Sequence, residues 1–453
     1  MLKIRPHYFL YMLAASLPLS AFPFLNFETR AITWDWVVLS VLLLVFFVSV
    51  AMGKKVKIPR DEVLLFLFLF NFFLMLSGIR PALSENSKQL LDFLTAWPQY
   101  VLFSLAFVVI ASLRCQASVV RSILQWYLVV AWVVAMFGII QAISHWLFRV
   151  DLYPRLTHVM YTKSESGYEM YLGGLSRAVS IFEEPRQFGE YLDVAFFTTL
   201  MSFQWDPPIF RHRWMRRTIF SALLVGILLS LSTSAYLGFV IMAILVIGIS
   251  GTRLRKRIIM MLLMGLTGGL FFAYILKIKF GVSLGGYLAK RFHTLHHARE
   301  ILELDVELGG IARYIRGTII ALKVAVENPV FGTGVNQSHY WLSPYESLGP
   351  VVMPPFDLLA SVGILGTTCF VGFFYALMKR ACNIRKQLGE KNRFEIETAL
   401  GLLGIAVIAT LGASWHQYNT SLFWFPVYVA TLIIYSMPTW KLRSPVKSNT
   451  DEK

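Results

Sequence analysis

The sequence predicts an all-α polytopic integral membrane protein with about twelve transmembrane helices. Of its 453 residues, 56% are hydrophobic and 15% are aromatic, and the mean hydropathy is +0.60, well above the values of a soluble domain. Apolar segments of about 17 to 25 residues, long enough to cross a hydrocarbon core, recur along the chain. Clusters of Lys and Arg separate alternate segments, as the positive-inside rule predicts for cytoplasmic loops.

The predicted spans follow one another within a single membrane domain, residues 1–453. They are 9–25, 34–52, 63–79, 97–113, 123–148, 188–203, 219–231, 235–249, 258–278, 356–378, 398–413 and 422–436. The seventh and eighth are short and nearly continuous around Ser232-Thr233-Ser234. A single span here would put the basic clusters at Arg211 and Arg253 on opposite sides of the membrane, so we predict two spans.

The basic clusters also predict the orientation. With these spans and a cytoplasmic N-terminus, every cluster lies on the cytoplasmic side, and both termini are cytoplasmic. The clusters are 54–60, 211–217, 253–257, 379–393 and 441–447. The net charge of +16 then lies mainly beside anionic lipid headgroups, so membrane lipids are expected partners and nucleic acid is not. The three cysteines fall on inner loops or in a span, so no outer disulfide framework is expected.

Two polar loops are predicted on the outer face, 149–186 and the larger 280–353, which is expected to be partly helical. Because the other outer loops are short, we expect the chemistry in these two. The sequence patterns of P-loop nucleotide hydrolysis, zinc proteolysis and the hydrolase nucleophile elbow do not occur in the chain. Matching pairs of interrupted spans, typical of secondary transporters, are not apparent either.

Three stretches of these loops carry the functional signal. The first loop runs into the sixth span through GGLSRAVSIFEEPRQFGEYL, residues 173–192. The second contains IARYIR at 311–316, a mostly apolar run through Val326, and ENPVFGTG at 327–334. It closes with PPFDLLASVGILG at 354–366, which enters the tenth span.

In this order and on these loops, the stretches resemble the O-antigen polymerase and ligase superfamily of bacterial envelope enzymes. The family pattern has an Arg-bearing Phe-x-Glu-Pro segment, a Ser/Thr-rich span junction, an outer loop with an Arg, a helix and Asn-Pro-x-x-Gly-x-Gly, and a Gly-Ile-Leu-Gly span start. Ser232-Thr233-Ser234 is similar to the junction, although Ala235 or Tyr236 replaces the Arg that often follows. The resemblance covers residues 176–366.

The resemblance implies a glycosyltransferase of the bacterial inner membrane that uses neither metal nor cofactor and has its active site facing the periplasm. Its donor is a glycan on undecaprenyl pyrophosphate, and a chain-length regulator and a flippase are its implied neighbours. Cleavage of the sugar–phosphate bond develops negative charge on the pyrophosphate. Guanidinium groups suit that charge, because they are permanently positive and form bidentate hydrogen bonds.

The resemblance and this chemistry together give the candidate residues. The candidate catalytic residues are Arg186, Arg313, Glu184 and His339, and the candidates for binding pyrophosphate or glycan are Arg177, Arg316 and Arg291. Arg313 is the best match to the family's second-loop Arg, with Arg316 as the alternative; at i and i+3 they share a helix face. The acceptor hydroxyl needs a proton acceptor, for which Glu183 is a further candidate. Alternatively, the outer-face arginines snorkel to lipid phosphates.

Other polar residues leave alternatives open. Glu190 and Asp193 lie in the sixth predicted span, where an ionisable group indicates function, although helix–helix bonding or a wet cavity wall explains them as well. The histidines within 293–297 have helical metal-ligand spacing near Glu300, but an exposed polar helix explains them better, so we predict no metal site. The run 319–326 is either an interfacial helix or a lid over the spans.

Within the family, we favour a polymerase, which extends the glycan on its lipid carrier, over a ligase, which transfers it to lipid A-core. Ligases carry a His about a dozen residues before the Gly-Ile-Leu-Gly motif, and here that stretch reads PVVMP, residues 350–354. His339, further upstream, is the substitute that the chain offers. The rival from another class is a flippase or other transporter of lipid-linked oligosaccharide, which should carry functional charges at mid-membrane and small outer loops.

Overall fold

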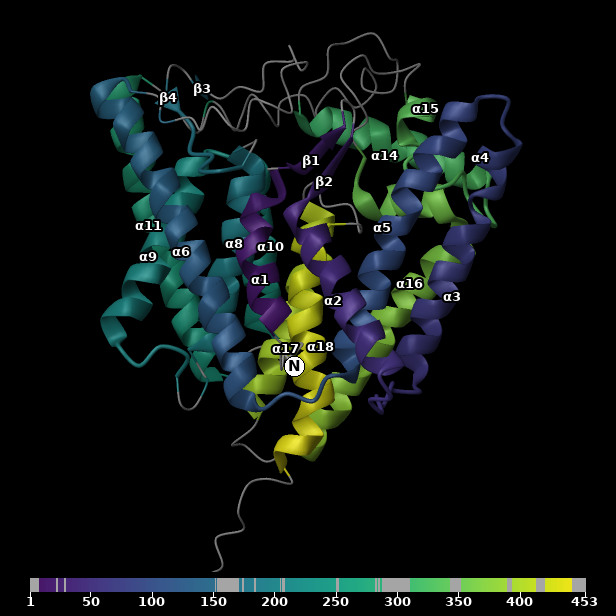
Figure 1. Cartoon of the computed structure of the whole chain (residues 1–453). Helices are drawn as coiled ribbons and strands as arrows, with labels where there is room; N and C mark the ends of the chain where they lie inside the picture. The colour runs from purple at the N-terminus through teal and green to yellow at the C-terminus, as the bar shows by residue number, and fades with distance from the viewer. Residues whose placement is uncertain are drawn as a thin grey trace, which may run out of the picture.

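The computed structural model describes residues 8–21, 23–27, 30–150, 152, 171–172, 175–182, 185–203, 205, 208–249, 252–281, 283, 286, 310–342, 352–388, 393–412 and 420–441. This part of the chain is mostly helical. Most of its helices run between two ends of the molecule, which we name upper and lower after the view in Figure 1. Helix α14 (Gly310–Glu327) instead lies across the upper end (Figure 1).

Six helical segments in the described residues are long and apolar enough to cross a membrane, which supports an all-α membrane protein. Each coincides with a predicted span. They are α2 (Trp34–Ala51), α3 (Glu62–Leu76) with the short α4 (Ile79–Leu83), α5 (Ser87–Ser112), α6 (Ala117–Phe148), α16 (Pro354–Gln387) and α18 (Ser421–Lys441).

The other six predicted spans also coincide with helices, but these helices are not among the six membrane-crossing candidates of the described residues. They are α1 (Tyr8–Ser16), α8 (Pro185–Ser202), α9 (Arg213–Ser230), α10 (Thr233–Ile249), α11 (Thr252–Phe280) and α17 (Arg393–Gly412). Helix α10 has only 17 residues, and α8 and α9 each carry three ionisable side chains. The helical nature of the predicted segments is therefore confirmed, and the count of about twelve spans is not.

The first predicted span, 9–25, is wrong in its second half. Helix α1 ends at Ser16, a 3₁₀ turn follows at Leu17–Ala21, and β1 (Pro23–Phe27) then pairs antiparallel with β2 (Arg30–Thr33). Proline has no backbone N–H to donate and clashes with the preceding helical turn. Pro18 therefore stops the α-helix, even though the apolar composition continues to Leu25.

The decision to read two segments around Ser232 is confirmed, because α9 and α10 are separate helices. Leu231 adopts a left-handed conformation with φ 46°, which ends α9. The hydroxyl of Ser232 then accepts a hydrogen bond from the N–H of Ala235 at 3.4 Å, and α10 begins.

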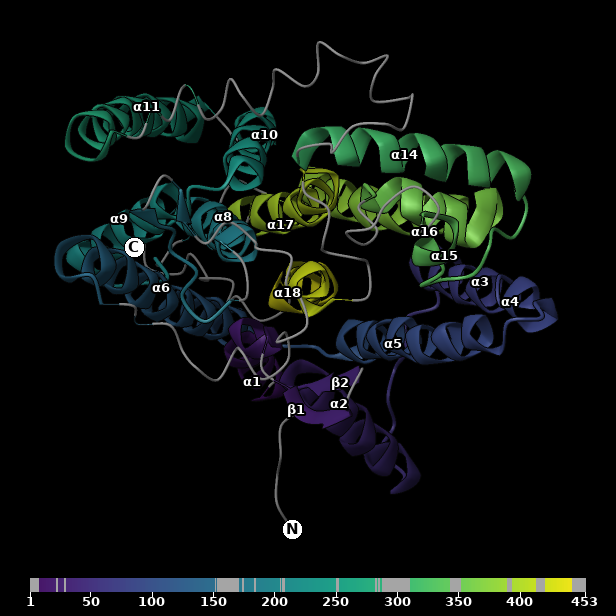
Figure 2. The same ribbon diagram turned by 90° about the horizontal axis from the view of Figure 1, so that it is seen from above.

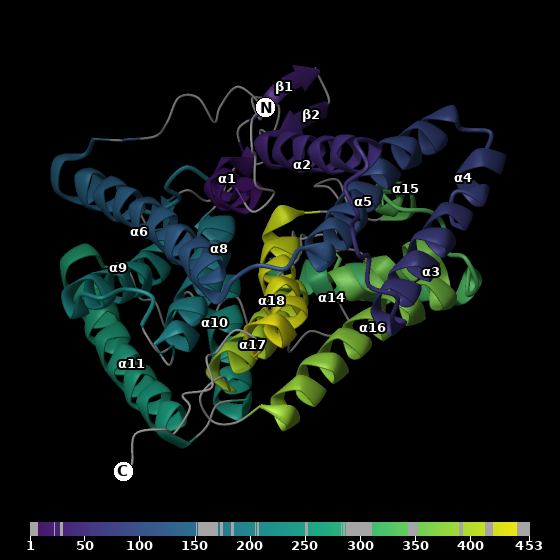
Figure 3. The ribbon, with the colours of Figure 1, turned by 60° about the horizontal axis from the view of Figure 1, so that its bottom comes forward.

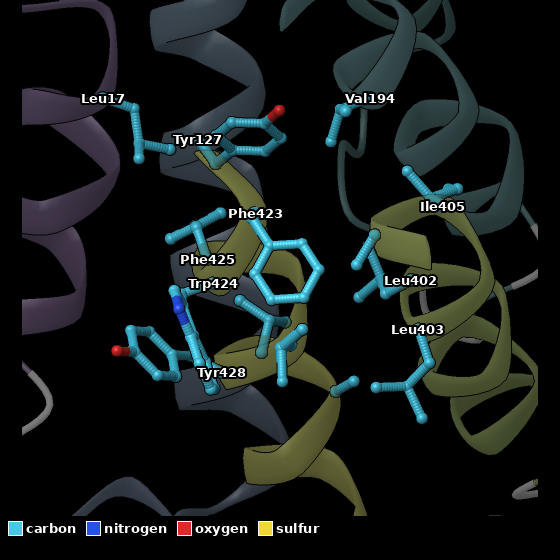
Figure 4. Close-up of a cluster of buried hydrophobic side chains, with 14 of the residues drawn as sticks. Leu17, Tyr127, Val194, Leu402, Leu403, Ile405, Phe423, Trp424, Phe425 and Tyr428 are labelled. Atoms are coloured by element: carbon cyan, nitrogen blue, oxygen red, sulfur yellow. The ribbon is translucent and has the colours of Figure 1, made fainter. Parts of the chain in front are cut away.

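Helix α18 forms the centre of the bundle. Viewed from above it is surrounded by α5, α8, α16, α17 and α1 (Figure 2), and 89% of its spanning window is buried. Trp424 on α18 stacks on Phe103 of α5 with ring centroids 6.2 Å apart and contacts Phe373 of α16 at 6.1 Å. Tyr127 of α6 and Val194 of α8 approach α18 from another side (Figure 4). This shared aromatic core holds helices from both halves of the chain together.

At the lower end, ion pairs join helices that lie far apart in sequence. Arg380 near the end of α16 lies 2.6 Å from Asp61, which caps α3, and Lys379 lies 3.1 Å from Glu62. Arg385 lies 2.7 Å from Glu397 of α17. Seen with the lower end forward, α16 runs from beside α3 towards α17 (Figure 3). The basic cluster 54–60 and the described part of the cluster 379–393 thus occupy the same end of the molecule.

Candidate functional site

Arg177 binds the end of a helix. It follows the short ribbon of β3 (Tyr171–Leu172) and β4 (Leu175–Ser176), and its guanidinium donates to the carbonyl oxygens of Ser230 at 3.2 Å and Leu231 at 2.9 Å. The last carbonyls of an α-helix have no intrahelical donor. Arg177 therefore caps α9 and ties the first-loop motif to the junction between α9 and α10.

A buried glutamine holds the next part of the same motif. The side-chain oxygen of Gln141 on α6 accepts hydrogen bonds from the N–H groups of Val179 at 3.1 Å and Ser180 at 2.9 Å. The hydroxyl of Ser180 donates to the carbonyl of Val134 at 2.8 Å. Sequence reasoning missed Gln141, for which the available signal was a polar amide inside the predicted span 123–148.

Arg186, Glu190 and Asp193 lie on one face of α8, at i, i+4 and i+7, in a helix that is buried along most of its length. The Arg186 side chain is 13% exposed, and its Nε lies 3.8 Å from Oε1 of Glu190. Asp193 is 0% exposed, and among the described residues neither of its carboxylate oxygens has a hydrogen-bond partner. A Cβ on Gly238 of α10 would lie 3.3 Å from that carboxylate. Both acids are thus buried between helices.

Helix α14 confirms the helix predicted from residue 311 to Val326. Ala321 and Ala325 pack with Ala360 of α16 in a small buried cluster, while Leu322 on another face is exposed. The buried alanines fit packing over the spans and the exposed apolar side chains fit an interfacial helix, so both readings of this run stay predictions. The predicted partly helical nature of the second loop is also confirmed by α14 and by α15 (Ser338–Leu342).

The turn after α14 interlocks with a break in α16. At Gly363 the backbone has φ 66° and ψ −173°, which interrupts the helix. An interrupted helix has carbonyl and N–H groups without intrahelical partners, and the turn supplies them. The three backbone hydrogen bonds run from Thr333 to Ala360 (2.9 Å), from Gly334 to Ser361 (2.8 Å) and from Ile364 to Pro329 (2.8 Å).

Two glycines make this interlock sterically feasible. Gly332 has φ 70°, and a Cβ there would overlap the backbone carbonyl of Ser361. A Cβ on Gly363 would likewise overlap the carbonyl of Val330. The Asn-Pro-x-x-Gly-x-Gly stretch and the Gly-Ile-Leu-Gly stretch are therefore two sides of one contact. The backbone of each stretch occupies the space that a Cβ on the glycine of the other stretch would need.

Arg316 on α14 is buried, with 7% exposure, and its Nε has no hydrogen-bond partner among the described residues. Burying a guanidinium N–H without an acceptor is costly, so a ligand oxygen would stabilise it. Arg313 lies on the same helix three residues earlier, as predicted, but its side chain falls outside the described part. Arg316 therefore has a buried N–H that could bind an anion, and the role of Arg313 as the best match stays a prediction.

His339 on α15 is held by an acid that sequence reasoning missed. Its Nε2 lies 3.3 Å from Oδ2 of Asp92 on α5, and the hydroxyl of Tyr340 donates to the same oxygen at 2.6 Å. Burial, reinforced by the hydrogen bond and charge of Asp92, raises the pKa of Tyr340 to about 12. The His339 side chain remains 39% exposed. The three side chains thus form a cluster with a partly accessible imidazole.

The start of α4 also contacts the turn after α14. The guanidinium of Arg80 donates to the side-chain oxygen of Asn328. Nearby, the side-chain amide of Gln337 donates to the carbonyl of Gln89 at 2.9 Å. Arg80 was not among the predicted site residues, because it follows directly after the third predicted span and has no motif around it. Two segments distant in sequence, 80–89 and 328–337, therefore meet at the upper end.

Several predicted residues fall outside the described part of the chain. These are Glu183, Glu184, Arg291 and the histidines within 293–297, so their predicted roles stay predictions. Within the described residues there is no group of three His, Cys, Asp or Glu side chains that could hold a metal ion.

No protein-family model matches the chain, and no curated protein matches it either.

Proposed function

We propose that this chain is a glycosyltransferase of the bacterial inner membrane that polymerises undecaprenyl-pyrophosphate-linked oligosaccharide repeat units into O-antigen or a related surface polysaccharide. In this proposal it has about twelve spans, cytoplasmic termini and a site facing the periplasm. The observation that carries the proposal is the interlock of the turn 328–334 with the break at Gly363. Two motifs that the resemblance treats as separate form one hydrogen-bonded unit directly after α14.

Arg316 suits the charge that this reaction develops. The acceptor hydroxyl attacks the anomeric carbon, the bond from that carbon to the pyrophosphate oxygen breaks, and its electrons stay on the pyrophosphate. A phosphate oxygen would supply the acceptor that the buried Nε of Arg316 lacks among the described residues. Arg186 and Arg313 are proposed to bind the same anion. Arg177 is a weaker candidate, because its donors already hold α9.

His339 is proposed as the group that takes the proton of the acceptor hydroxyl. A carboxylate on one imidazole nitrogen fixes the ring and its tautomer, so the second nitrogen becomes the proton acceptor. Asp92 would be the positioning residue, since its oxygen lies 3.3 Å from Nε2 of His339. The partial exposure of the imidazole leaves it accessible to a substrate.

The test is a strain that lacks the gene, complemented with wild type, Arg316→Ala, Arg186→Ala or His339→Ala, with the surface polysaccharide ladder compared on a gel. Arg149→Ala is the matched control, because Arg149 is an exposed arginine at the upper end of α6. We expect wild type and the control to restore the ladder and the three site variants to fail at equal protein level.

The null strain distinguishes the reactions. Lipid A-core that carries a single repeat unit in the null strain supports the polymerase. Bare core, with long polymer accumulating on the lipid carrier, would assign the chain as a ligase. An unchanged ladder in the null strain would remove this pathway altogether.

One observation favours transport of lipid-linked oligosaccharide as a second candidate. Asp193 lies eight residues into α8, about 12 Å from its start at the rise of an α-helix, and is fully buried. An acid at that depth of a spanning helix is typical of a transport pathway. If the chain is a transporter, the null strain should display bare core without polymer on the carrier, and Asp193→Asn should reproduce that phenotype.

A further inference from the structure

A pocket lies at the upper end between the α3–α4 segment and the turn that follows α14. Its walls come from residues 76–89 and 328–332, and its volume is about 600 Å³. Small-molecule sites in proteins typically measure about 300–1,000 Å³. The pocket is therefore large enough for a ligand, and it is separate from Arg186, Arg316 and His339, none of which lines it.

The charge of the pocket selects an anion. Among the described residues that line it, Arg80 is the one ionisable side chain, and no carboxylate opposes it. The hydrogen bond from the guanidinium to Asn328 holds Arg80 against the wall. Ser84 and Gln89 add further polar groups to the lining. A fixed guanidinium with neighbouring hydrogen-bonding groups is the arrangement that binds a phosphate.

The rest of the lining is apolar and opens to the surface. Leu83 is 80% exposed, and Ile79, Val330 and Phe331 are also exposed. These side chains lie next to the end of a candidate span, Glu62–Leu83. An apolar surface beside an arginine at the end of a membrane-spanning helix matches a molecule with a charged headgroup and a hydrocarbon chain.

We propose that the Arg80 pocket binds the phosphate headgroup of an anionic lipid, with the first carbons of the lipid chains against Leu83, Val330 and Phe331. The proposal does not depend on the glycosyltransferase function, because it rests on the lining of this pocket. The chemistry recognised is a phosphate, and the apolar wall distinguishes a lipid phosphate from a free one.

The experiment titrates the full chain in a neutral detergent with short-chain phosphatidic acid and measures the heat of binding. Three variants accompany wild type. Arg80→Gln removes the charge. Val330→Trp narrows the pocket at an exposed position and keeps the charge of Arg80, and Arg149→Gln is the control for a general loss of positive charge.

We expect Arg80→Gln and Val330→Trp each to weaken binding on the order of tenfold or more, and Arg149→Gln to bind as wild type does. Short-chain phosphatidylcholine and inorganic phosphate should both bind more weakly than phosphatidic acid. Equal binding by wild type and Arg80→Gln would overturn the proposal, as would equal binding of phosphatidylcholine. Inorganic phosphate binding as tightly as the lipid would overturn the lipid assignment and leave a free-phosphate site.

Discussion

Replacing Gly363 by alanine should separate α16 from the turn that follows α14. Gly363 has φ 66° and ψ −173°, a region that is essentially restricted to glycine and costs other residues about 1–3 kcal/mol. The new Cβ would also overlap the carbonyl of Val330, so the two segments must move apart. Each backbone hydrogen bond between them contributes about 0.5–1.5 kcal/mol. The strain and the loss of two such bonds together predict a destabilisation of about 2–6 kcal/mol.

The assay is unfolding of the purified protein in detergent, with hydrogen exchange followed at Thr333 and Gly334. Gly248→Ala in α10 is the matched control, because a Cβ there meets nothing within 4 Å. In a helix, alanine is favoured over glycine by up to about 1 kcal/mol, so this variant should be neutral or stabilised. In Gly363→Ala, and not in the control, the amides of Thr333 and Gly334 should lose protection.

If Gly363→Ala unfolds at the same temperature as Gly248→Ala, Gly363 does not hold the two segments together. If stability falls while both amides keep their protection, the destabilisation arises elsewhere than at the interlock, which would also contradict the prediction.

Three further predictions follow from single contacts. Arg177→Gln should lower stability by about 1–3 kcal/mol, because two carbonyls of α9 lose their donor; a melting temperature equal to wild type would contradict that cap. The absorbance titration of wild type, after subtraction of that of Tyr340→Phe, reports the ionisation of Tyr340 and should give a pKa of about 12, which Asp92→Asn should shift towards 10. Because the pKa is raised in the folded state, the stability that this contact contributes is complete below pH 10 and is lost as the pH rises towards 12. Asp193→Asn should keep or raise the melting temperature, since a buried carboxylate with no hydrogen-bond partner among the described residues is costly. A clear fall would show that the charge stabilises α8.

Hydrophobic patterning located the helices well, because each predicted segment contains enough apolar residues to drive its burial at any position in the bundle. It failed at residues 17–25, where Pro18 and the pairing of β1 with β2 outweigh composition. It also could not show which helices face lipid. Helix α18 and helix α8 are both inside the bundle, yet only α18 is apolar enough to stand out as a span. Position within a bundle depends on packing partners, which a single sequence does not reveal.

The candidate site includes the glycine motifs of 327–334 and 363–366 that the sequence singles out, although their contact with each other was not predicted. Its acidic and polar supports were not predictable in this way. Asp92 and Tyr340 are 248 residues apart, and so are Arg80 and Asn328. These contacts arise because α15 and the turn after α14 pack onto α4 and α5. The sequence of either region contains no pattern that identifies the other as its partner.

The central place of α18 has a consequence for how the protein is made. Helix α18 is synthesised after α5, α6, α8, α16 and α17, yet Trp424 and its neighbours lie between them. Until the ribosome has released this segment, the faces of the earlier helices that will contact α18 lack that partner and are open to lipid. The central helix of the bundle is therefore the last to be added. A chain that stops before Ser421 would lose the common core of the bundle rather than one peripheral helix.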